Sequence, residues 1–294
     1  MIPVSLPILA ERVLRTALVA RGYRADRVPT TAGWMHVLHA RGRGQFPPVL
    51  LLHGFSSAGV HFAPLMRRLR PHVRRLVAPD MPGHGFSDVP TGGLTPRTMT
   101  HGLRETLEQI LVEPHVVFGN SMGGLAAIRM VQEQPDLVRA LILASPTGAA
   151  MTRDEFASFR STLEFRSRAH AAVFVDHVFG RRIRGRSLVA WGTERRFRSP
   201  ALRNLLARST IDNLLTAEQL AAIDVPILVI WGRRDGVLPP SCRAFYKEHL
   251  PAHAVFEEPE TFGHSPYLDR PGAVAERVLA YLSELGPVTA ARAA

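Results

Sequence analysis

Short runs of aliphatic and β-branched residues recur along the chain, and turn-forming residues follow each run. Apolar runs this short predict buried strands. Longer segments with helical spacing alternate with them, such as Pro64–Leu69, Leu103–Val112 and Ala273–Leu282. The alternation predicts the α/β class, a mostly parallel twisted sheet with helices on both faces. We expect strands at Pro48–Leu52, Leu76–Ala78, His115–Phe118, Ala140–Leu143, Pro226–Trp231 and Ala254–Glu257, with leading strands in residues 22–40.

One long stretch breaks this alternation. Between Pro146 and Asp224 the apolar residues keep a helical spacing, with Phe156, Phe159 and Leu163 on one face. An all-helical insertion between two strands predicts a cap over the carboxyl ends of the sheet, where ligands bind in open α/β folds. We therefore divide the chain into a first core part, a helical cap and a second core part, at residues 1–146, 147–224 and 225–294.

The N-terminal segment has a helical pattern of its own. One side of a helix over Met1–Gly22 would be apolar, and the charged residues Glu11, Arg12 and Arg15 lie elsewhere. The apolar side would consist of Ile8, Leu9, Val13, Leu14 and Leu18. We expect it to pack onto the protein's own core or cap, and a membrane-surface role is the alternative. The segment lacks the basic n-region of a secretory signal, and no apolar stretch approaches the ~20 residues needed to cross a bilayer. These features predict a cytoplasmic protein.

Composition narrows the choice of partners. The chain has 294 residues and 46% hydrophobic content, enough for one globular core with an insertion. Its formal net charge is +11, and a strongly positive charge is a feature of many nucleic-acid-binding proteins. However, the basic residues are spread along the chain without a recognition motif, so we expect no nucleic-acid partner. Cys242 is the only cysteine, which excludes an internal disulfide and a cysteine-based zinc site.

The segment Gly119–Gly123, Gly-Asn-Ser-Met-Gly, carries the candidate chemistry. A predicted strand ends at Phe118, and a helical pattern begins near Leu125. Glycines two residues on either side of Ser121 allow the sharp strand-to-helix turn of a nucleophile elbow, which exposes the serine hydroxyl. An ordinary glycine-rich turn fits this segment equally well, so other residues must support the assignment.

A serine nucleophile requires a general base and an acid that fixes the tautomer of the base. Asp235 follows one late predicted strand, and His264 follows the next. Both therefore fall on the edge of the sheet where Ser121 lies. Asp224 and Asp269 are less suitably placed to be the acid. Among the histidines, only His264 lies in a Gly-His pair after the last predicted strand.

These residues together resemble the α/β-hydrolase superfamily, whose members carry Ser, Asp and His in this order. The segment His53–Phe55, His-Gly-Phe, resembles the oxyanion-loop motif of that family, and residues 80–87 resemble its Asp-x-x-Gly-x-Gly-x-Ser structural turn. The resemblance covers nearly the whole chain and implies the α/β-hydrolase fold. It also implies that the backbone N–H groups of Phe55 and Met122 bind the negative oxygen of a tetrahedral intermediate. We expect His53 and His84 to brace loops.

A serine at this turn implies acyl transfer through an acyl-enzyme, with no metal or organic cofactor. We expect a serine hydrolase that cleaves carboxylic esters of small to medium apolar substrates, with Phe156 and Phe159 lining the pocket. Asn120 also occurs in carbon–carbon bond hydrolases of dienoic ring-cleavage products. Those enzymes often have Trp after the catalytic His, where this chain has Ser265. Perhydrolase or acyltransferase activity and a ligand receptor on the same fold are further alternatives.

Overall fold

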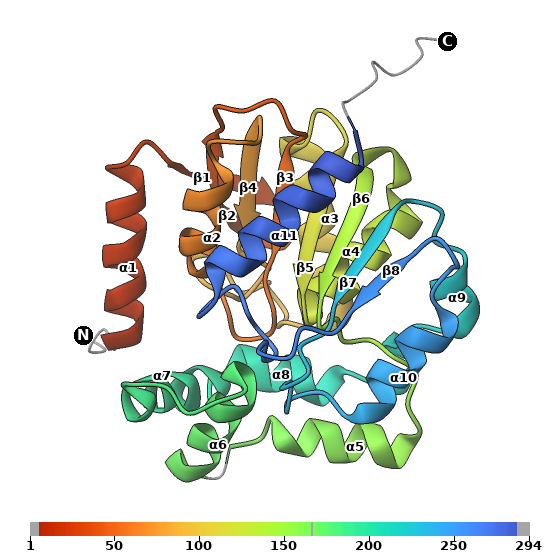
Figure 1. Ribbon diagram of the computed structural model, residues 1–294. Coiled ribbons are helices and arrows are strands. Elements are labelled where there is room, and N and C mark those ends of the chain that lie inside the picture. Colours follow the sequence, from red (N-terminus) through yellow and green to blue (C-terminus); the bar gives the residue numbers. More distant parts are fainter. Residues whose placement is uncertain (1–5, 166, 287–294) are drawn as a thin grey trace.

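The computed structural model describes residues 6–165 and 167–286. Its centre is an eight-stranded sheet in the order β1-β2-β4-β3-β5-β6-β7-β8 (Figure 1). β2 pairs antiparallel with β1 and β4, and the remaining neighbours run parallel. This confirms the predicted mostly parallel sheet. The strands are β1 (Arg24–Thr30), β2 (Gly33–Arg41), β3 (Val49–Leu52), β4 (Arg75–Pro79), β5 (His115–Asn120), β6 (Val138–Ala144), β7 (Ile227–Ile230) and β8 (Val255–Glu257).

The central strands are buried on both faces. In β3, Leu50 and Leu52 belong to the core cluster on one side of the sheet, whereas Val49 and Leu51 belong to the cluster on the other. Successive side chains of a strand point to opposite faces, so both sets must be apolar here. This is why continuous apolar runs predicted these strands.

Helices cover both faces. α2 (Ala63–Leu69) and α11 (Pro271–Glu284) contribute to one core cluster, and α3 (Pro96–Ile110), α4 (Met122–Glu133) and α10 (Pro240–His249) contribute to the other. In Figure 1, α11 crosses in front of the sheet and α3 and α4 lie behind it. The predicted helices are present, although α3 begins several residues earlier than its apolar pattern.

The early start of α3 has a local cause. Thr95 accepts a hydrogen bond from the backbone N–H of Thr98 at 3.1 Å, and the Thr98 hydroxyl bonds back to the Thr95 N–H group at 2.9 Å. Pro96 is the first residue of the helix, where its missing N–H costs nothing. This polar first turn carries no apolar periodicity.

α1 (Leu6–Val19) packs beside β1, with Leu18 buried. The apolar face predicted for this helix also contained Leu9 and Val13, and that part of the prediction is wrong. These two side chains are 48% and 61% exposed. The side chain of Ile8 lies outside the described residues. The acidic residue Glu11 is buried on the packed face of the helix instead.

The chain between β6 and β7 is helical. It contains α5 (Arg153–Thr162), α6 (Arg168–Phe179), α7 (Arg186–Phe197), α8 (Pro200–Arg208), η3 (Ile211–Asn213) and α9 (Ala217–Ala221). Figure 1 shows α5 to α8 below the sheet. There they meet the loops that follow the strands: the carbonyl of Val178 accepts a hydrogen bond from the Ser265 N–H group at 3.2 Å. The helices therefore lie at the carboxyl ends of the parallel strands.

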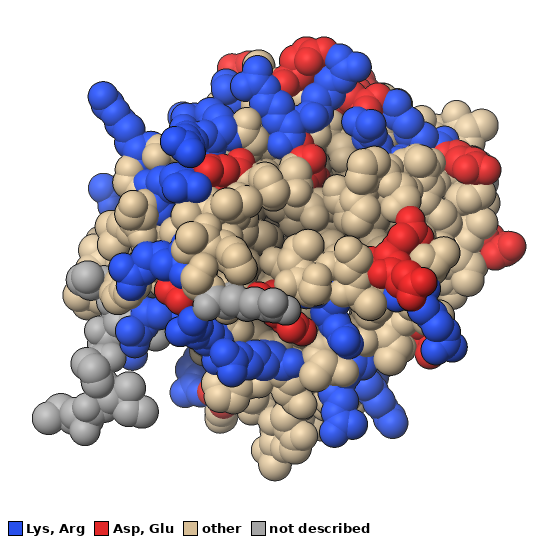
Figure 2. Space-filling model, turned by 90° about the horizontal axis from the view of Figure 1, so that it is seen from below, with Lys and Arg blue, Asp and Glu red and all other residues tan. Residues whose placement is uncertain are grey.

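Basic side chains are common on the side of the molecule where α5 to α8 lie, with acidic ones among them (Figure 2). Arg186 lies 2.7 Å from Asp176, and Arg181 lies 3.1 Å from Asp269. Partly exposed pairs of this kind contribute about 0–1 kcal/mol each. Asp269, an alternative candidate for the acid, is thus bound to an arginine of the helical segment between β6 and β7.

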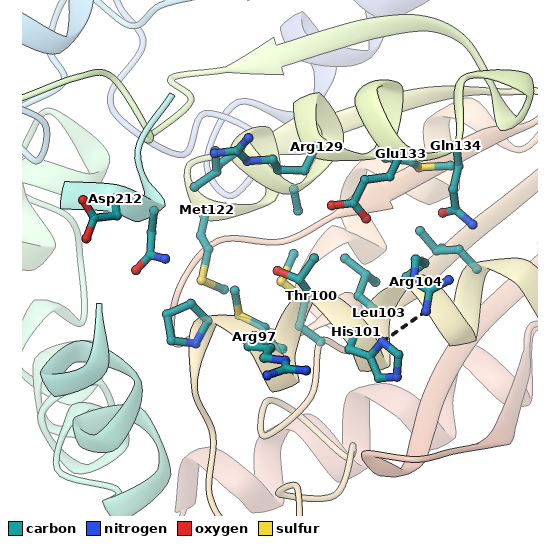
Figure 3. Close-up of a pocket in the computed structure, with 18 residues that line it drawn as sticks. Arg97, Thr100, His101, Leu103, Arg104, Met122, Arg129, Glu133, Gln134 and Asp212 are labelled. Atoms are coloured by element: carbon teal, nitrogen blue, oxygen red, sulfur yellow. Dashed lines mark hydrogen bonds between the residues drawn. The ribbon is translucent and has the colours of Figure 1, made fainter. Parts of the chain in front are cut away.

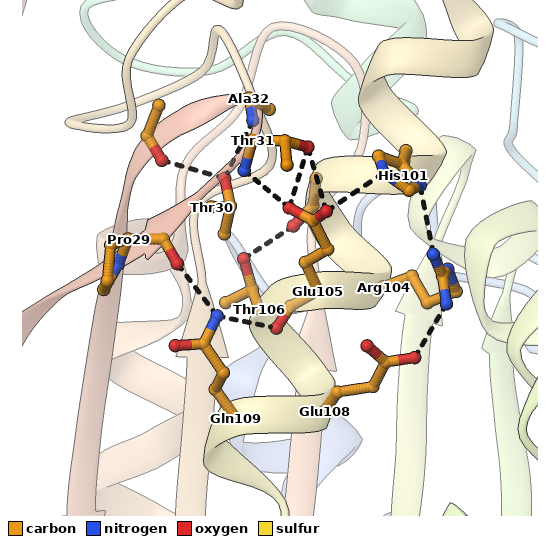
Figure 4. Close-up of polar contacts among 12 residues, drawn as sticks. Pro29, Thr30, Thr31, Ala32, His101, Arg104, Glu105, Thr106, Glu108 and Gln109 are labelled. Carbon is orange, nitrogen blue, oxygen red and sulfur yellow. Dashed lines mark hydrogen bonds and ion pairs between the residues drawn. The ribbon is translucent and has the colours of Figure 1, made fainter.

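A polar cluster joins α3 to the turn between β1 and β2 (Figure 4). Glu105 accepts hydrogen bonds from the backbone N–H of Thr31 at 2.7 Å and from its hydroxyl at 2.9 Å. Gln109 donates to the carbonyl of Pro29 at 2.8 Å. Burial raises the pKa of Glu105, but the bonds from Thr31 outweigh it and leave that pKa below its ordinary value. The cluster ties the antiparallel end of the sheet to the helical layer.

Candidate active site

Ser121 occupies a sharp turn between β5 and α4. Its φ of 54° and ψ of −119° are strained for a residue other than glycine. A Cβ atom placed on Gly119 would lie 2.4 Å from the carbonyl oxygen of Gly123, and one on Gly123 would lie 2.0 Å from the carbonyl oxygen of Leu52. Both positions require glycine because backbone atoms meet there. The turn has the geometry of a nucleophile elbow.

His264 and Asp235 form a buried pair. The Nδ1 atom of His264 lies 2.8 Å from Oδ2 of Asp235, and Oδ1 of Asp235 accepts from the backbone N–H groups of Val237 and Leu238 at 2.8 and 3.3 Å. Burial raises the pKa of Asp235, but His264 and these amides outweigh it and leave that pKa below its ordinary value. The ionised carboxylate holds the His264 Nδ1–H group and leaves Nε2 as the atom that can accept a proton.

Asn120 joins the turn of Ser121 to the loop of His264. Its Nδ2 donates to the carbonyls of Ala144 and His264 at 2.9 and 2.8 Å, and its Oδ1 accepts from the Ser265 hydroxyl at 2.9 Å. Asn120 therefore holds His264 close to Ser121 in the fold. Among the residues that the structure describes, no hydrogen bond joins Ser121 to His264, so the contact between nucleophile and base stays a prediction. Such bonds often tighten only when substrate is bound.

The loop of residues 53–57 contains the Phe55 amide and is named the oxyanion loop after the role predicted for that amide. The backbone N–H of Met81 donates to Nε2 of His53 at 3.0 Å, so this network assigns the ring proton to Nδ1, which donates to the Gly54 carbonyl at 2.8 Å. Burial lowers the pKa of His53 and keeps the ring neutral. Within the described residues, the N–H groups of Phe55 and Met122 donate to no other group.

Asp80 anchors the predicted structural turn. Its buried carboxylate accepts from the backbone N–H groups of Gly59 at 2.6 Å and Phe86 at 2.8 Å, and it lies 2.9 Å from Nδ1 of His36. Burial raises the pKa of Asp80, but His36 outweighs this effect and leaves that pKa below its ordinary value. Gly85 has a φ of 53°, and a Cβ atom there would lie 2.2 Å from Asp80 Oδ2. The packing of the turn around Asp80 therefore requires a glycine at this position of the motif, which gives the motif a structural role.

His84 also has a structural setting. Its Nδ1 lies 2.9 Å from the carbonyl oxygen of Pro82, and its ring centroid lies 5.3 Å from that of His53 and 6.0 Å from that of Phe55. Burial lowers the pKa of His84 to about 3, so the ring is neutral at physiological pH. His53 and His84 both brace loops beside the site.

Aromatic side chains join the helices between β6 and β7 to the oxyanion loop. The Phe55 ring lies 5.1 Å from Phe197 of α7, and Phe197 lies 4.4 Å from Phe165 and 5.2 Å from Phe174. Phe165 and Phe174 thus pack within an aromatic cluster. The sequence pattern gave no reason to single out Phe197, because its partners lie far away along the chain.

A cavity of about 490 Å³ opens between α3, α4 and η3. Figure 3 shows Met122 and Arg129 on the side of α4, and Arg97, Thr100 and His101 on the side of α3. Much of its lining is apolar, including Met81, Met99, Leu103, Met122, Leu125 and Met130.

Neither Phe156 nor Phe159 lines this cavity, and Ser121 does not line it either. Both phenylalanines are half-buried, and Phe159 packs against the core and against the aromatic cluster of Phe165 and Phe197. Their role in substrate binding stays a prediction. Met122 is the residue that connects the cavity with the nucleophile turn.

The family model for the alpha/beta hydrolase fold matches residues 47–271. The chain belongs to the α/β-hydrolase family. This α/β hydrolase is 31% identical over 263 residues to the pimeloyl-[acyl-carrier protein] methyl ester esterase of Xanthomonas campestris pv. campestris (strain B100), a match that covers 84% of this chain and 100% of that protein.

Two solved structures share the fold of this α/β hydrolase. A serine hydrolase from Cycloclasticus zankles has a TM-score of 0.76 at 16% identity, covering 90% of this chain and 99% of that one. The meta-cleavage product hydrolase from Pseudomonas fluorescens IP01 has a TM-score of 0.71 at 20% identity, covering 88% and 97%. At these identities the likeness concerns the fold alone.

Outside the candidate triad, the described part of this α/β hydrolase holds no cluster of metal ligands and no reactive thiol. No three His, Cys, Asp or Glu side chains gather there as metal ligands. Cys242 is buried, and burial raises the pKa of its thiol to about 12. None of the described helices combines the length and apolar character needed to span a membrane.

Proposed function

We propose that this α/β hydrolase is a serine esterase that cleaves carboxylic esters of small to medium apolar substrates through an acyl-enzyme on Ser121. The observation that carries the proposal is the buried pair of Asp235 and His264, which Asn120 attaches to the turn that presents Ser121. The esterase relative at 31% identity supports the same reaction class. The substrate is a small-molecule ester, and no cofactor takes part.

In the proposed reaction, Nε2 of His264 accepts the hydroxyl proton of Ser121 while the serine oxygen attacks the ester carbonyl. Asp235 keeps the imidazole in the required tautomer and stabilises the imidazolium. The backbone N–H groups of Phe55 and Met122 bind the oxygen that becomes negative. Loss of one such donor costs about 2.7–4 kcal/mol of transition-state stabilisation in other hydrolases.

The reaction then proceeds through two further stages, formation of the acyl-enzyme and its hydrolysis. The alcohol leaves with the proton held by His264, which produces the acyl-enzyme. Water attacks this ester while His264 accepts one of its protons, and the serine oxygen then leaves with that proton from His264, which regenerates Ser121 and releases the acid. The net reaction converts one ester and one water into an acid and an alcohol.

The helices of residues 147–224 serve in this proposal as a cap over the acyl pocket. Phe156 and Phe159 of α5 are the candidate roof residues. An apolar pocket discriminates by about 1–3 kcal/mol per methylene, so Phe156→Ala or Phe159→Ala should shift the ratio of kcat/KM between short and long esters by roughly ten- to two-hundredfold. An unchanged chain-length profile in both variants would indicate that the acyl pocket lies elsewhere, and the cavity beside Met122 would be the next candidate.

Carbon–carbon bond hydrolysis is less well supported. Asn120 is the residue shared with that subgroup, and here its side chain makes three hydrogen bonds to neighbouring protein groups. These bonds account for an asparagine at position 120 without any role in substrate binding. Ser265, which stands where that subgroup often has Trp, is one of its partners.

The decisive experiment compares wild type with Ser121→Ala. Both are assayed on aryl esters of increasing chain length and on a dienoic diketone, and both are treated with a fluorophosphonate that labels activated serines. Ester turnover and labelling that disappear together in a folded Ser121→Ala protein would support the proposal. Faster turnover of the diketone would favour carbon–carbon hydrolysis, and ligand binding without turnover would favour a receptor.

A further inference from the structure

Glu11 of α1 is a buried acid that the proposed reaction does not use. The residue is 7% exposed. Its Oε1 pairs with the guanidinium of Arg196 on α7 and lies 2.7 Å from Nε2 of His61 on η1 (Gly59–Phe62). A buried carboxylate is costly unless it is paired. Glu11 thus connects the N-terminal helix with the cap and with the segment that follows the oxyanion loop.

Arg196 extends this contact to the oxyanion loop itself. Its Nη1 donates to the carbonyl of Ser56 at 2.9 Å. Ser56 has a φ of 62°, a conformation that costs free energy in a residue other than glycine and needs support from its surroundings. Burial lowers the pKa of Arg196 to about 10, which leaves the guanidinium charged at neutral pH. Ser56 directly follows Phe55, so the guanidinium restrains the backbone beside the proposed oxyanion donor.

His61 forms a second connection between Glu11 and the same loop. Burial lowers the pKa of His61, so the ring is neutral. Its Nε2 faces the carboxylate of Glu11, and its Nδ1 lies 2.8 Å from the hydroxyl of Ser57. With the proton on Nε2, the Ser57 hydroxyl donates to Nδ1, and the Nε2–H group lies beside the Glu11 carboxylate. The backbone N–H of Ser57 donates in turn to the Gly54 carbonyl at 3.2 Å. Both connections to the loop therefore meet at Glu11.

We infer that Glu11 and Arg196 are positioning residues that hold the oxyanion loop in its catalytic conformation, so that α1 takes part in catalysis without touching substrate. The inference rests on the proposed function, in which the Phe55 N–H group binds the oxyanion. Donors of this kind act because they are fixed before the reaction, and a misplacement of about 1 Å can cost up to 10²-fold in rate. An ion pair that only joined α1 to the cap would change stability and leave the chemical step unaffected.

The test uses three variants of the full chain. Glu11→Gln and Arg196→Met each remove one member of the pair. The double variant Glu11→Met with Arg196→Met removes both charges, so that no unpaired buried charge remains to unfold the protein. Arg198→Met is the matched control, because Arg198 lies at the end of the same helix and pairs with Glu194 at 3.0 Å.

We expect kcat on an aryl ester to fall about 10- to 100-fold in Arg196→Met and in the double variant, with KM changed less than about twofold. Affinity for a boronic acid should fall in parallel, because its tetrahedral adduct on Ser121 presents an oxygen to the oxyanion loop. Glu11→Gln should lose activity in the same sense. Arg198→Met should keep wild-type kcat.

Two results would overturn the inference. A folded double variant with wild-type kcat and boronic acid affinity would show that the pair has no positioning role. An equal loss in Arg198→Met would show a general effect of cap charge. A wild type without ester turnover and without boronic acid binding would overturn the proposed function first, which keeps the two failures distinguishable.

Discussion

Replacing Asn120 with alanine should weaken both the fold and the reaction. The substitution removes all three hydrogen bonds of the amide. The Ala144 carbonyl keeps a partner, because it also accepts from the backbone N–H of Ser121 at 3.1 Å. The carbonyl of His264 and the hydroxyl of Ser265 lose their bonds to the amide, and a buried polar group that loses its partner costs about 1–3 kcal/mol. The expected loss in the free energy of unfolding is therefore about 2–6 kcal/mol.

This loss converts into a measurable change in Tm. An unfolding entropy of about 2.1 cal/mol/K per residue gives roughly 0.6 kcal/mol/K for the 294 residues of the chain. Asn120→Ala should then lower the Tm by about 3–10 °C, measured by calorimetry or circular dichroism. Turnover of an aryl ester should fall at temperatures where the variant is folded, because the loop of His264 loses its link to the nucleophile turn.

Asn204→Ala is the matched control. The amide of Asn204 donates to the Leu94 carbonyl at 3.0 Å and is only half-buried, so its loss should cost about 1 kcal/mol. A double-mutant cycle between Asn120→Ala and Ser265→Ala should show a coupling of about 1 kcal/mol. A Tm loss no larger than that of the control, together with zero coupling, would refute this reasoning.

Three further predictions concern the triad and a buried histidine. Ser121→Ala should reduce ester turnover by about 10³-fold or more with an unchanged circular dichroism spectrum, and substantial remaining turnover would contradict covalent catalysis. Asp235→Asn should lower kcat by about 10⁴-fold with little change in KM, because an amide favours the wrong tautomer of His264; a loss below tenfold would point to another acid. His84 should make the protein less stable as pH falls from about 6.5 towards 3, because the unfolded chain binds a proton there that the folded protein excludes, at up to about 1.4 kcal/mol per pH unit. Urea unfolding between about pH 4.5 and 7 should show a shallower slope for His84→Gln, which keeps a donor for the Pro82 carbonyl, and an identical slope would contradict this assignment.

The pattern of apolar residues was sufficient to predict the parallel sheet and the order of the candidate catalytic residues along the chain. Buried parallel strands consist of continuous apolar residues, so runs such as that of β3 were recognisable one by one. The carboxyl ends of parallel strands meet at one edge, which is why Ser121, Asp235 and His264 were expected together. The glycines around Ser121 were also informative, because backbone contacts at Gly119 and Gly123 leave no room for a side chain.

Which polar groups are buried, and what they bind, depends on how distant segments pack. Glu11 lies among charged and apolar residues in a helical pattern, and nothing local distinguishes it from an exposed glutamate. Its burial depends on Arg196 and His61, which come from distant parts of the chain. The same holds for Asn120, whose bond to the His264 carbonyl spans 144 positions. A local pattern predicts which positions are periodically buried. The hydrogen-bond partner of a buried polar group comes from a distant segment, so it depends on tertiary packing.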